Sequence, residues 1–271
     1  MAMNETKKEN KAPIKANDIQ RTLHKNMDFT ATEQYKLLRA NLSFTLPDEK
    51  KCFVIGVTSS VRGEGKSTTS INLSYVLAEA GKKVLLIDGD LRIPSVAKKM
   101  DIQRTPGLTN IILDGTYDTL ENYKMEDTPK WHVLPAGDLP PNPSELLGSR
   151  KMEKFLHAAS EKFDYIIIDL PPVNIVSDAL AISHLLDGML LVVREDYTAR
   201  KDLDSCVTQL KLSNVNVLGC VMNVIKAEKR GYGRYRRYDR YYKRYGYKYG
   251  YGYSYGYGYD NADKANNTKK K

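Results

Sequence analysis

Short apolar runs alternate along this chain with longer stretches that have helical spacing. The apolar runs are rich in Val, Ile and Leu and lack polar alternation, which is typical of strands buried on both faces of a sheet. The predicted strands are residues 53–57, 84–88, 131–134, 165–169, 189–193 and 215–222. The helices predicted between them are residues 66–80, 150–162, 175–186 and 199–212. This order predicts an α/β fold with a mostly parallel sheet flanked by helices.

One further helix is predicted ahead of the first strand, over residues 30–44. Thr30 and Glu33 have the spacing of a capping box, so we expect the helix to begin there. Its two sides differ: Tyr35, Leu38 and Leu42 form the apolar side, and Glu33, Lys36 and Arg39 form the charged side. The helix is therefore predicted to present one apolar face and one charged face.

Composition divides the 271 residues into a neutral part and a basic tail. No Leu, Ile, Val, Met or Phe follows Ile225. Residues 228–271 hold 13 Lys/Arg and 4 Asp/Glu, whereas the rest of the chain holds 29 of each. Because a segment without aliphatic residues cannot form a core, we expect the tail to be disordered. The predicted organisation is therefore a disordered or extended segment at 1–29, a domain at 30–227 and the tail at 228–271.

Some classes of protein are disfavoured by the same composition. No run of eighteen or more apolar residues occurs, so we expect no membrane-spanning helix. Cys52, Cys206 and Cys220 are isolated from one another, which disfavours a disulfide framework or a zinc site. We therefore expect a cytoplasmic protein with reduced thiols, brought to a membrane only by a partner or by charge.

A glycine-rich segment between the first predicted strand and its helix indicates a P-loop. It reads Ser59-Ser-Val-Arg-Gly-Glu-Gly-Lys-Ser67, with serine at the position of the usual first glycine. Glycines let backbone amides surround phosphate oxygens, lysine reaches the β- and γ-phosphates, and the serine hydroxyl can bind Mg²⁺. The predicted nucleotide-binding residues are Gly63, Glu64, Gly65, Lys66, Ser67 and Thr68. The predicted cofactors are ATP and Mg²⁺.

Carboxylates follow two other predicted strands. Asp88 and Asp90 end one strand, and Asp169 ends the strand of a Walker B element. Each could instead cap the element that follows it. One carboxylate near Mg²⁺ is enough to hold the metal, whereas a second near the γ-phosphate could accept a proton from an attacking hydroxyl.

These motifs resemble those of the bacterial protein-tyrosine kinases of capsule and exopolysaccharide synthesis, the BY-kinases. The resemblance covers about residues 30–225. It rests on the P-loop, on a second motif read as Walker A′, Leu86-Ile-Asp-Gly-Asp-Leu-Arg-Ile-Pro94, on Pro140-Pro-Asn-Pro-Ser-Glu-Leu-Leu147 and on Asp169-Leu-Pro-Pro172. A tyrosine-rich C-terminus completes the set. The chain departs from the family at Arg62, where proline is frequent.

The resemblance implies a role for each matching residue. Lys66, Asp88 and Asp90 form the implied catalytic set, in which Lys66 stabilises the transferring phosphoryl group and Asp88 is the candidate base. The implied Mg²⁺ ligands are Ser67, Asp90 and Asp169, and Asn223 is implied to contact adenine.

It also implies partners. Members carry Glu-x-x-Arg-x-x-Arg for subunit contacts in a ring, and here the motif reads Glu33, Lys36, Arg39. Lysine keeps the charge but loses the bidentate fork of arginine. A membrane adaptor with an activating cytoplasmic tail is implied, as in the split form of the family, together with a cognate phosphotyrosine phosphatase. The kinase would then act at the inner face of the membrane.

The tail's tyrosines are the predicted phosphate acceptors. Residues 231–259 hold 13 of the chain's 19 tyrosines. They are Tyr232, Tyr235, Tyr238, Tyr241, Tyr242, Tyr245, Tyr247, Tyr249, Tyr251, Tyr253, Tyr255, Tyr257 and Tyr259. The predicted function is tyrosine autophosphorylation of this cluster, in trans, to regulate capsule or exopolysaccharide synthesis.

Two alternatives stay open at this level. A partition or septum-placing ATPase shares the fold and the acidic elements, but usually carries a lysine early in the P-loop, where this chain has Val61. Its basic amphipathic C-terminal helix is also missing from this sequence. A nucleic-acid-binding module is the second alternative, because Arg and Lys interleaved with aromatic residues suit phosphates and stacked bases.

Overall fold

The structure, a computed structural model, describes residues 23–46 and 50–223. Its centre is a seven-stranded sheet with the order β3-β4-β2-β5-β1-β6-β7. The strands are β1 (Phe53–Ser59), β2 (Val84–Asp88), β3 (Lys124–Met125), β4 (Thr128–Leu134), β5 (Tyr165–Asp169), β6 (Gly188–Arg194) and β7 (Val217–Asn223). Every pairing is parallel except that of β3 with β4. The predicted α/β class with a mostly parallel sheet is confirmed.

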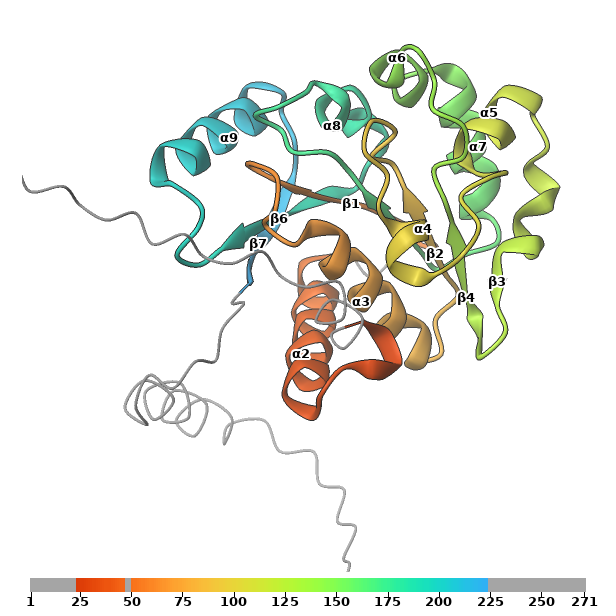
Figure 1. The fold of residues 1–271 in the computed structure, drawn as a ribbon, viewed down its shortest axis with the longest axis horizontal. Coiled ribbons are helices and arrows are strands. Elements are labelled where there is room, and N and C mark those ends of the chain that lie inside the picture. Colours follow the sequence, from red (N-terminus) through yellow and green to blue (C-terminus); the bar gives the residue numbers. More distant parts are fainter. Residues whose placement is uncertain (1–22, 47–49, 224–271) are drawn as a thin grey trace, which may run out of the picture. The chain divides into compact units, whose positions relative to one another are not determined.

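Helices cover both faces of this sheet. They are α2 (Phe29–Thr45), α3 (Lys66–Glu79), α4 (Val96–Met100), α5 (Leu108–Asp114), α6 (Pro143–Leu147), α7 (Arg150–Ser160), α8 (Asp178–Ala181) and α9 (Arg200–Leu212). Three 3-10 turns add η1 (His24–Asn26), η2 (Tyr117–Tyr123) and η3 (Ser183–Leu185). Figure 1 shows α2 and α3 on one side of the sheet and α7, α8 and α9 on the other.

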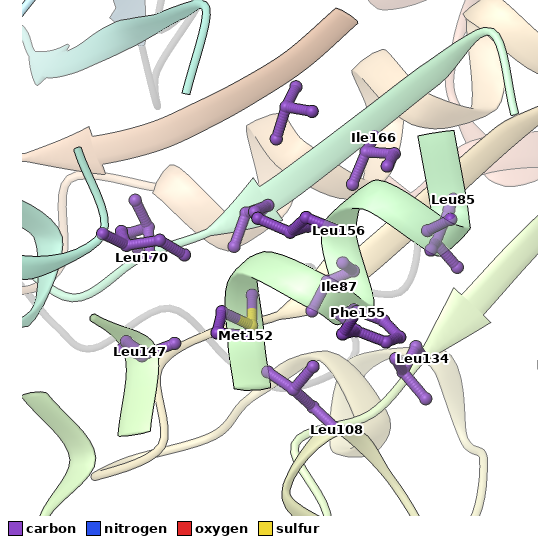
Figure 2. Packing of buried hydrophobic residues seen from close by; sticks show 14 of the residues in the cluster. Leu85, Ile87, Leu108, Leu134, Leu147, Met152, Phe155, Leu156, Ile166 and Leu170 are labelled. Atoms are coloured by element: carbon purple, nitrogen blue, oxygen red, sulfur yellow. The ribbon is translucent and has the colours of Figure 1, made fainter. Parts of the chain in front are cut away.

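Two hydrophobic cores follow from these layers. Val54 of β1 belongs to the core under α7, while its neighbour Ile55 belongs to the core under α3. In Figure 2, Met152, Phe155 and Leu156 of α7 gather over the strand residues of the first core. Burying a strand on both faces requires apolar residues at consecutive positions, which explains the unbroken apolar runs of the sequence.

The first helix begins earlier than predicted, and its predicted capping box is wrong. Asp28 is the N-cap, and its carboxylate accepts a hydrogen bond from the backbone N of Ala31 at 2.7 Å. Thr30 therefore lies inside the helix. The predicted apolar side is confirmed, because Leu42 is buried and Tyr35 and Leu38 pack against the core.

Two further predictions of local structure are wrong. The helix predicted at 175–186 is reduced to the single turn of α8 and the 3-10 turn η3. Its first residue, Ile175, is 48% exposed and hydrogen-bonds back to Pro172 O, within a turn that leaves the sheet. Residues 23–28, predicted to be disordered or extended, include η1 and the buried Leu23.

Several short elements were not predicted, namely α4, α5, α6 and β3. Within the described residues no helix is long and apolar enough to cross a membrane. The segment 1–22 and the tail, including every tyrosine of the predicted acceptor cluster, lie outside the described residues.

Candidate active site

The P-loop joins β1 to α3 and depends on two glycines with left-handed backbones. Gly63 has φ +82° and Gly65 has φ +96°. A Cβ added at Gly65 would lie 1.9 Å from Nδ2 of Asn223, and real Cβ atoms never approach a neighbour so closely. The left-handed backbone therefore favours glycine at this N-cap of α3, and a larger residue would also displace the Asn223 side chain. The first helical amides point out of the helix N-terminus here.

A buried carboxylate holds the loop together from inside. The Glu64 side chain accepts hydrogen bonds from Ser60 Oγ at 2.9 and 3.1 Å, from the backbone N of Val61 at 2.8 Å, and from Thr198 Oγ1. This explains why serine replaces the usual first glycine, because its hydroxyl supplies one of these bonds. The Glu64 side chain thus stabilises the conformation of the P-loop. The sequence predicts Glu64 only as a nucleotide-binding residue and does not indicate this structural role.

The segment after β6 holds the same loop from outside. Arg194 Nη1 donates to Gly63 O at 3.0 Å, and the Tyr197 hydroxyl donates to Arg62 O at 3.0 Å. The Arg194 guanidinium lies 4.6 Å from the centre of the Tyr197 ring. Sequence reasoning missed both residues, since no motif marks them.

Asn223, the last residue of β7, also contacts the loop. Its Nδ2 donates to Glu64 O at 3.0 Å. The structure therefore places this side chain against the P-loop backbone, so that the end of β7 lies beside the loop. Its predicted contact with adenine stays a prediction.

The acidic residues converge on the P-loop lysine. Asp88 and Asp169 are Cα partners at the ends of the paired strands β2 and β5. Lys66 Nζ lies 2.9 Å from Asp90 Oδ2 and 3.8 Å from Asp169 Oδ1. The whole predicted catalytic set, Lys66, Asp88 and Asp90, is thus brought together with Asp169 at one edge of the sheet. This is the edge where ligands bind in open α/β sheets.

Burial changes the acidity of these groups. Burial and the nearby charge of Asp169 raise the pKa of Asp88 to about 7, although the backbone N–H of Val96 works in the opposite direction. Burial also raises the pKa of Asp169, against the effect of the Lys66 charge. For Lys66, burial opposes the charged form, but the charges of Asp169 and Asp90 outweigh it and raise the pKa.

Asp88 is also fixed in position. Its Oδ2 accepts hydrogen bonds from the backbone N of Ser95 at 3.0 Å and of Val96 at 2.9 Å. Its Oδ1 accepts from the backbone N of Asp90 at 3.3 Å. The carboxylate therefore orients both the loop that carries Asp90 and the start of α4.

The predicted metal ligands suit Mg²⁺ chemically. Ser67 Oγ accepts a hydrogen bond from Ser95 Oγ at 2.9 Å, and Asp169 Oδ2 is buried without a hydrogen-bond partner among the described residues. Hydroxyl and carboxylate oxygens are the donors that Mg²⁺ prefers. Over residues 23–46 and 50–223 no three His, Cys, Asp or Glu side chains form a ready metal cage. In other proteins Mg²⁺ usually keeps waters and substrate phosphates as its further ligands.

An ion pair ties the Walker A′ loop to the neighbouring helices. Arg92 makes two hydrogen bonds of 2.9 Å to the buried Asp178 of α8. Ser144 of α6 donates to the same carboxylate. The Arg92 motif was visible in the sequence, but its partners lie 52 and 86 positions away and no pattern connected them.

The predicted subunit-contact residues lie away from this site, on α2. Glu33 and Lys36 form an exposed ion pair of 3.0 Å. Arg39 instead donates to the backbone O of Val76 in α3. Arg39 thus already has a partner within the chain.

Known sequences resemble this chain over most of its length. A family model described as an AAA domain matches residues 53–217. The tyrosine-protein kinase YwqD of Bacillus subtilis is 37% identical over 212 residues, which cover 78% of this chain and 88% of that protein. The putative tyrosine-protein kinase CapB of Staphylococcus aureus is 32% identical, over 76% of this chain and 90% of that protein.

Solved structures resemble the fold as well. The chimerical protein CapA2B2 matches with a TM-score of 0.69 and 29% identity, covering 75% of this chain and 89% of that one. The septum site-determining protein MinD of Pyrococcus horikoshii, complexed with Mg-ADP, matches with a TM-score of 0.53 and 24% identity, covering 69% of this chain and 76% of that one. The second likeness is one of fold alone.

Proposed function

The chain belongs to the bacterial protein-tyrosine kinases, and on this premise we propose that it phosphorylates the tyrosine cluster of its own C-terminus with ATP. The observation that carries this proposal is the convergence of Lys66, Asp88, Asp90 and Asp169 on one P-loop. Within an assembly of this chain, the 13 tyrosines in the tail of each neighbouring subunit would supply acceptors at high local concentration.

In the proposed reaction the tyrosine oxygen attacks the γ-phosphorus and the bond to the β–γ bridging oxygen breaks, which releases ADP. The Asp88 carboxylate takes the phenolic proton, and a pKa raised to about 7 makes it a better proton acceptor than an ordinary aspartate. Lys66 moves from Asp90 to the phosphates and stabilises their charge. Ser67, Asp90 and Asp169 would hold Mg²⁺, which neutralises phosphate charge when bound.

We further propose how the kinase is organised in the cell. Subunits associate through Glu33, Lys36 and Arg39 into a ring and act on one another's tails. A membrane adaptor with a cytoplasmic segment activates the ring at the inner face of the membrane, and a phosphotyrosine phosphatase reverses the reaction. The process regulated is capsule or exopolysaccharide synthesis, which the family resemblance supports.

The test is to incubate the purified protein with Mg·ATP and to map phosphate by mass spectrometry. Phosphotyrosine is expected within 232–259 in the unmodified protein and in Asp114→Asn, which alters an exposed carboxylate. It should vanish in Asp88→Asn. Steady ATP hydrolysis without phosphotyrosine, with or without an adaptor segment, would contradict the proposal and favour a partition-type ATPase. Salt-sensitive DNA or RNA binding by an unphosphorylatable tail would favour the nucleic-acid alternative.

A further inference from the structure

Lys99 belongs to a one-turn helix that is anchored directly behind the active site. The start of α4 is held by Asp88, and Val96 and Met100 are buried beneath the turn. The backbone N of Lys99 donates to Ser95 O at 3.0 Å. The origin of the Lys99 side chain is therefore fixed relative to the P-loop.

That side chain points to the first turn of α3. Lys99 Nζ lies 3.4 Å from Thr68 Oγ1. The adjacent residue, Ser67, is bonded to Ser95 at the other end of the same turn. Helix α3 has 14 residues, and its N-terminal amides create positive potential where phosphates bind. The Lys99 ammonium thus lies against the predicted phosphate site from the α4 side.

Its charge is unbalanced there. Over residues 23–46 and 50–223, no carboxylate lies within ion-pair distance of Lys99, whereas Lys66 has two. Burial lowers the pKa of Lys99, and the Lys66 charge lowers it further, against the more distant charge of Asp169. A half-buried ammonium whose partner is a hydroxyl is costly to keep charged, and an anion at this place would remove that cost.

We infer that Lys99 contacts a phosphate oxygen of the bound nucleotide and is a second lysine of the phosphate site, beside Lys66. This inference rests on the ATP site of the proposed function. Lys98, the preceding residue of the same turn, is exposed and offers the natural comparison. The two lysines contribute equally to net charge, but the Lys98 side chain is exposed to solvent whereas the Lys99 side chain contacts Thr68 of α3.

The test compares Lys99→Met, Lys99→Arg and Lys98→Met by titrating each protein with Mg·ADP in a calorimeter. Methionine keeps much of the apolar stem but removes the charge. We expect Lys99→Met to weaken Mg·ADP binding about tenfold, as for loss of one charge-assisted hydrogen bond. The affinity of Lys99→Arg for Mg·ADP should be closer to that of the unmodified protein than the affinity of Lys99→Met is. The affinity of Lys98→Met should equal that of the unmodified protein. Binding of adenosine, which has no phosphate, should be the same in all four proteins.

Several results would overturn the inference. Unchanged Mg·ADP binding in Lys99→Met would do so, and so would an equal loss in Lys98→Met, which would make the effect one of net charge. A parallel loss of adenosine binding would indicate a distorted site, and thermal unfolding of each variant checks the fold. Because the measurement is the affinity for Mg·ADP, this test of Lys99 remains valid even if the protein forms no phosphotyrosine. Conversely, the unmodified protein could form phosphotyrosine while the Lys99→Met variant binds Mg·ADP normally. That result would refute the phosphate contact of Lys99 and leave the proposed kinase function intact.

Discussion

At the scale of single residues, Gly65 and Gly115 share a left-handed backbone but have different surroundings. Their φ angles are +96° and +71°. A Cβ at Gly115 would meet nothing within 4 Å, whereas one at Gly65 would meet Asn223. We expect Gly115→Ala to cost about 1 kcal/mol of stability, from its backbone conformation alone. Gly65→Ala should additionally weaken Mg·ADP binding about tenfold, because Asn223 and the Glu64 carbonyl must separate.

Urea unfolding and calorimetric titration of both variants check this prediction. Equal binding by the two alanine variants would mean that the approach of Asn223 is unimportant for the loop.

The three thiols give a second prediction at this scale. Burial raises the pKa of Cys52 and of Cys206 to about 12, and both side chains are buried. Cys220 is exposed on β7, although partial burial of its thiol raises its pKa as well. Since the thiolate is the nucleophile, iodoacetamide at pH 8 should label Cys220 before the other two. Peptide mass mapping in native buffer and in urea measures this, and early labelling of Cys52 or Cys206 in native buffer would contradict it.

At the scale of elements, the start of α2 can be tested by two substitutions. Asp28→Ala removes the capping oxygen and should cost about 1 kcal/mol, while Thr30→Ala should cost little because Thr30 is exposed within the helix. The free energy of unfolding in urea distinguishes them. A larger loss of unfolding free energy for Thr30→Ala than for Asp28→Ala would instead support the capping box expected from the sequence.

The ion pair between the Walker A′ loop and α8 gives another prediction. Asp178 is buried, whereas the Arg92 side chain is 40% exposed. Partial exposure lowers the value of a charge pair, so we expect a coupling of about 1–2 kcal/mol in a double-mutant cycle of Arg92→Ala and Asp178→Ala. Strictly additive effects on unfolding would show that the pair contributes no stability. Arg92→Lys should recover only part of the coupling, because lysine lacks the bidentate fork.

The helices and strands also show which parts of the structure can be predicted from the sequence. The central strands were predicted because strands buried on both faces need continuous apolar runs. The P-loop, Asp88, Asp90 and Asp169 could be proposed as site residues because each lies at or just after the end of such a strand. Short elements such as α4 and β3 escaped because five and two residues are too few for a periodic pattern. Tyr197 and Asp178 escaped because their roles arise only when distant segments meet, and no local spacing records that.

At the scale of the whole molecule, the separation of charge between domain and tail makes a prediction about assembly. Residues 228–271 carry 13 basic and 4 acidic side chains. Each phosphotyrosine adds roughly −1.5 to −2 charge, so about six would cancel the excess and more would reverse it. If the proposed ring holds basic tails, its subunits should dissociate as those tails become anionic and repel one another.

Native mass spectrometry before and after incubation with Mg·ATP measures this effect. The Asp88→Asn variant serves as the control, because its assembly should not respond to ATP. A heavily phosphorylated tail in an unchanged assembly would refute the link between tail charge and association.

The pairing of Asp88 with Asp169 in the β2–β5 ladder has a consequence for how this enzyme can evolve. Neighbouring strands lie about 4.8 Å apart in any sheet, so the spacing of these two acids is inherited from backbone hydrogen bonds. A slip of one residue in either strand would turn one acid to the opposite face, and no intermediate arrangement exists. Insertions in the surface loops can therefore change what the protein recognises in small steps. The spacing between Asp88 and Asp169 cannot change in this gradual way, because any change of strand register removes the pair.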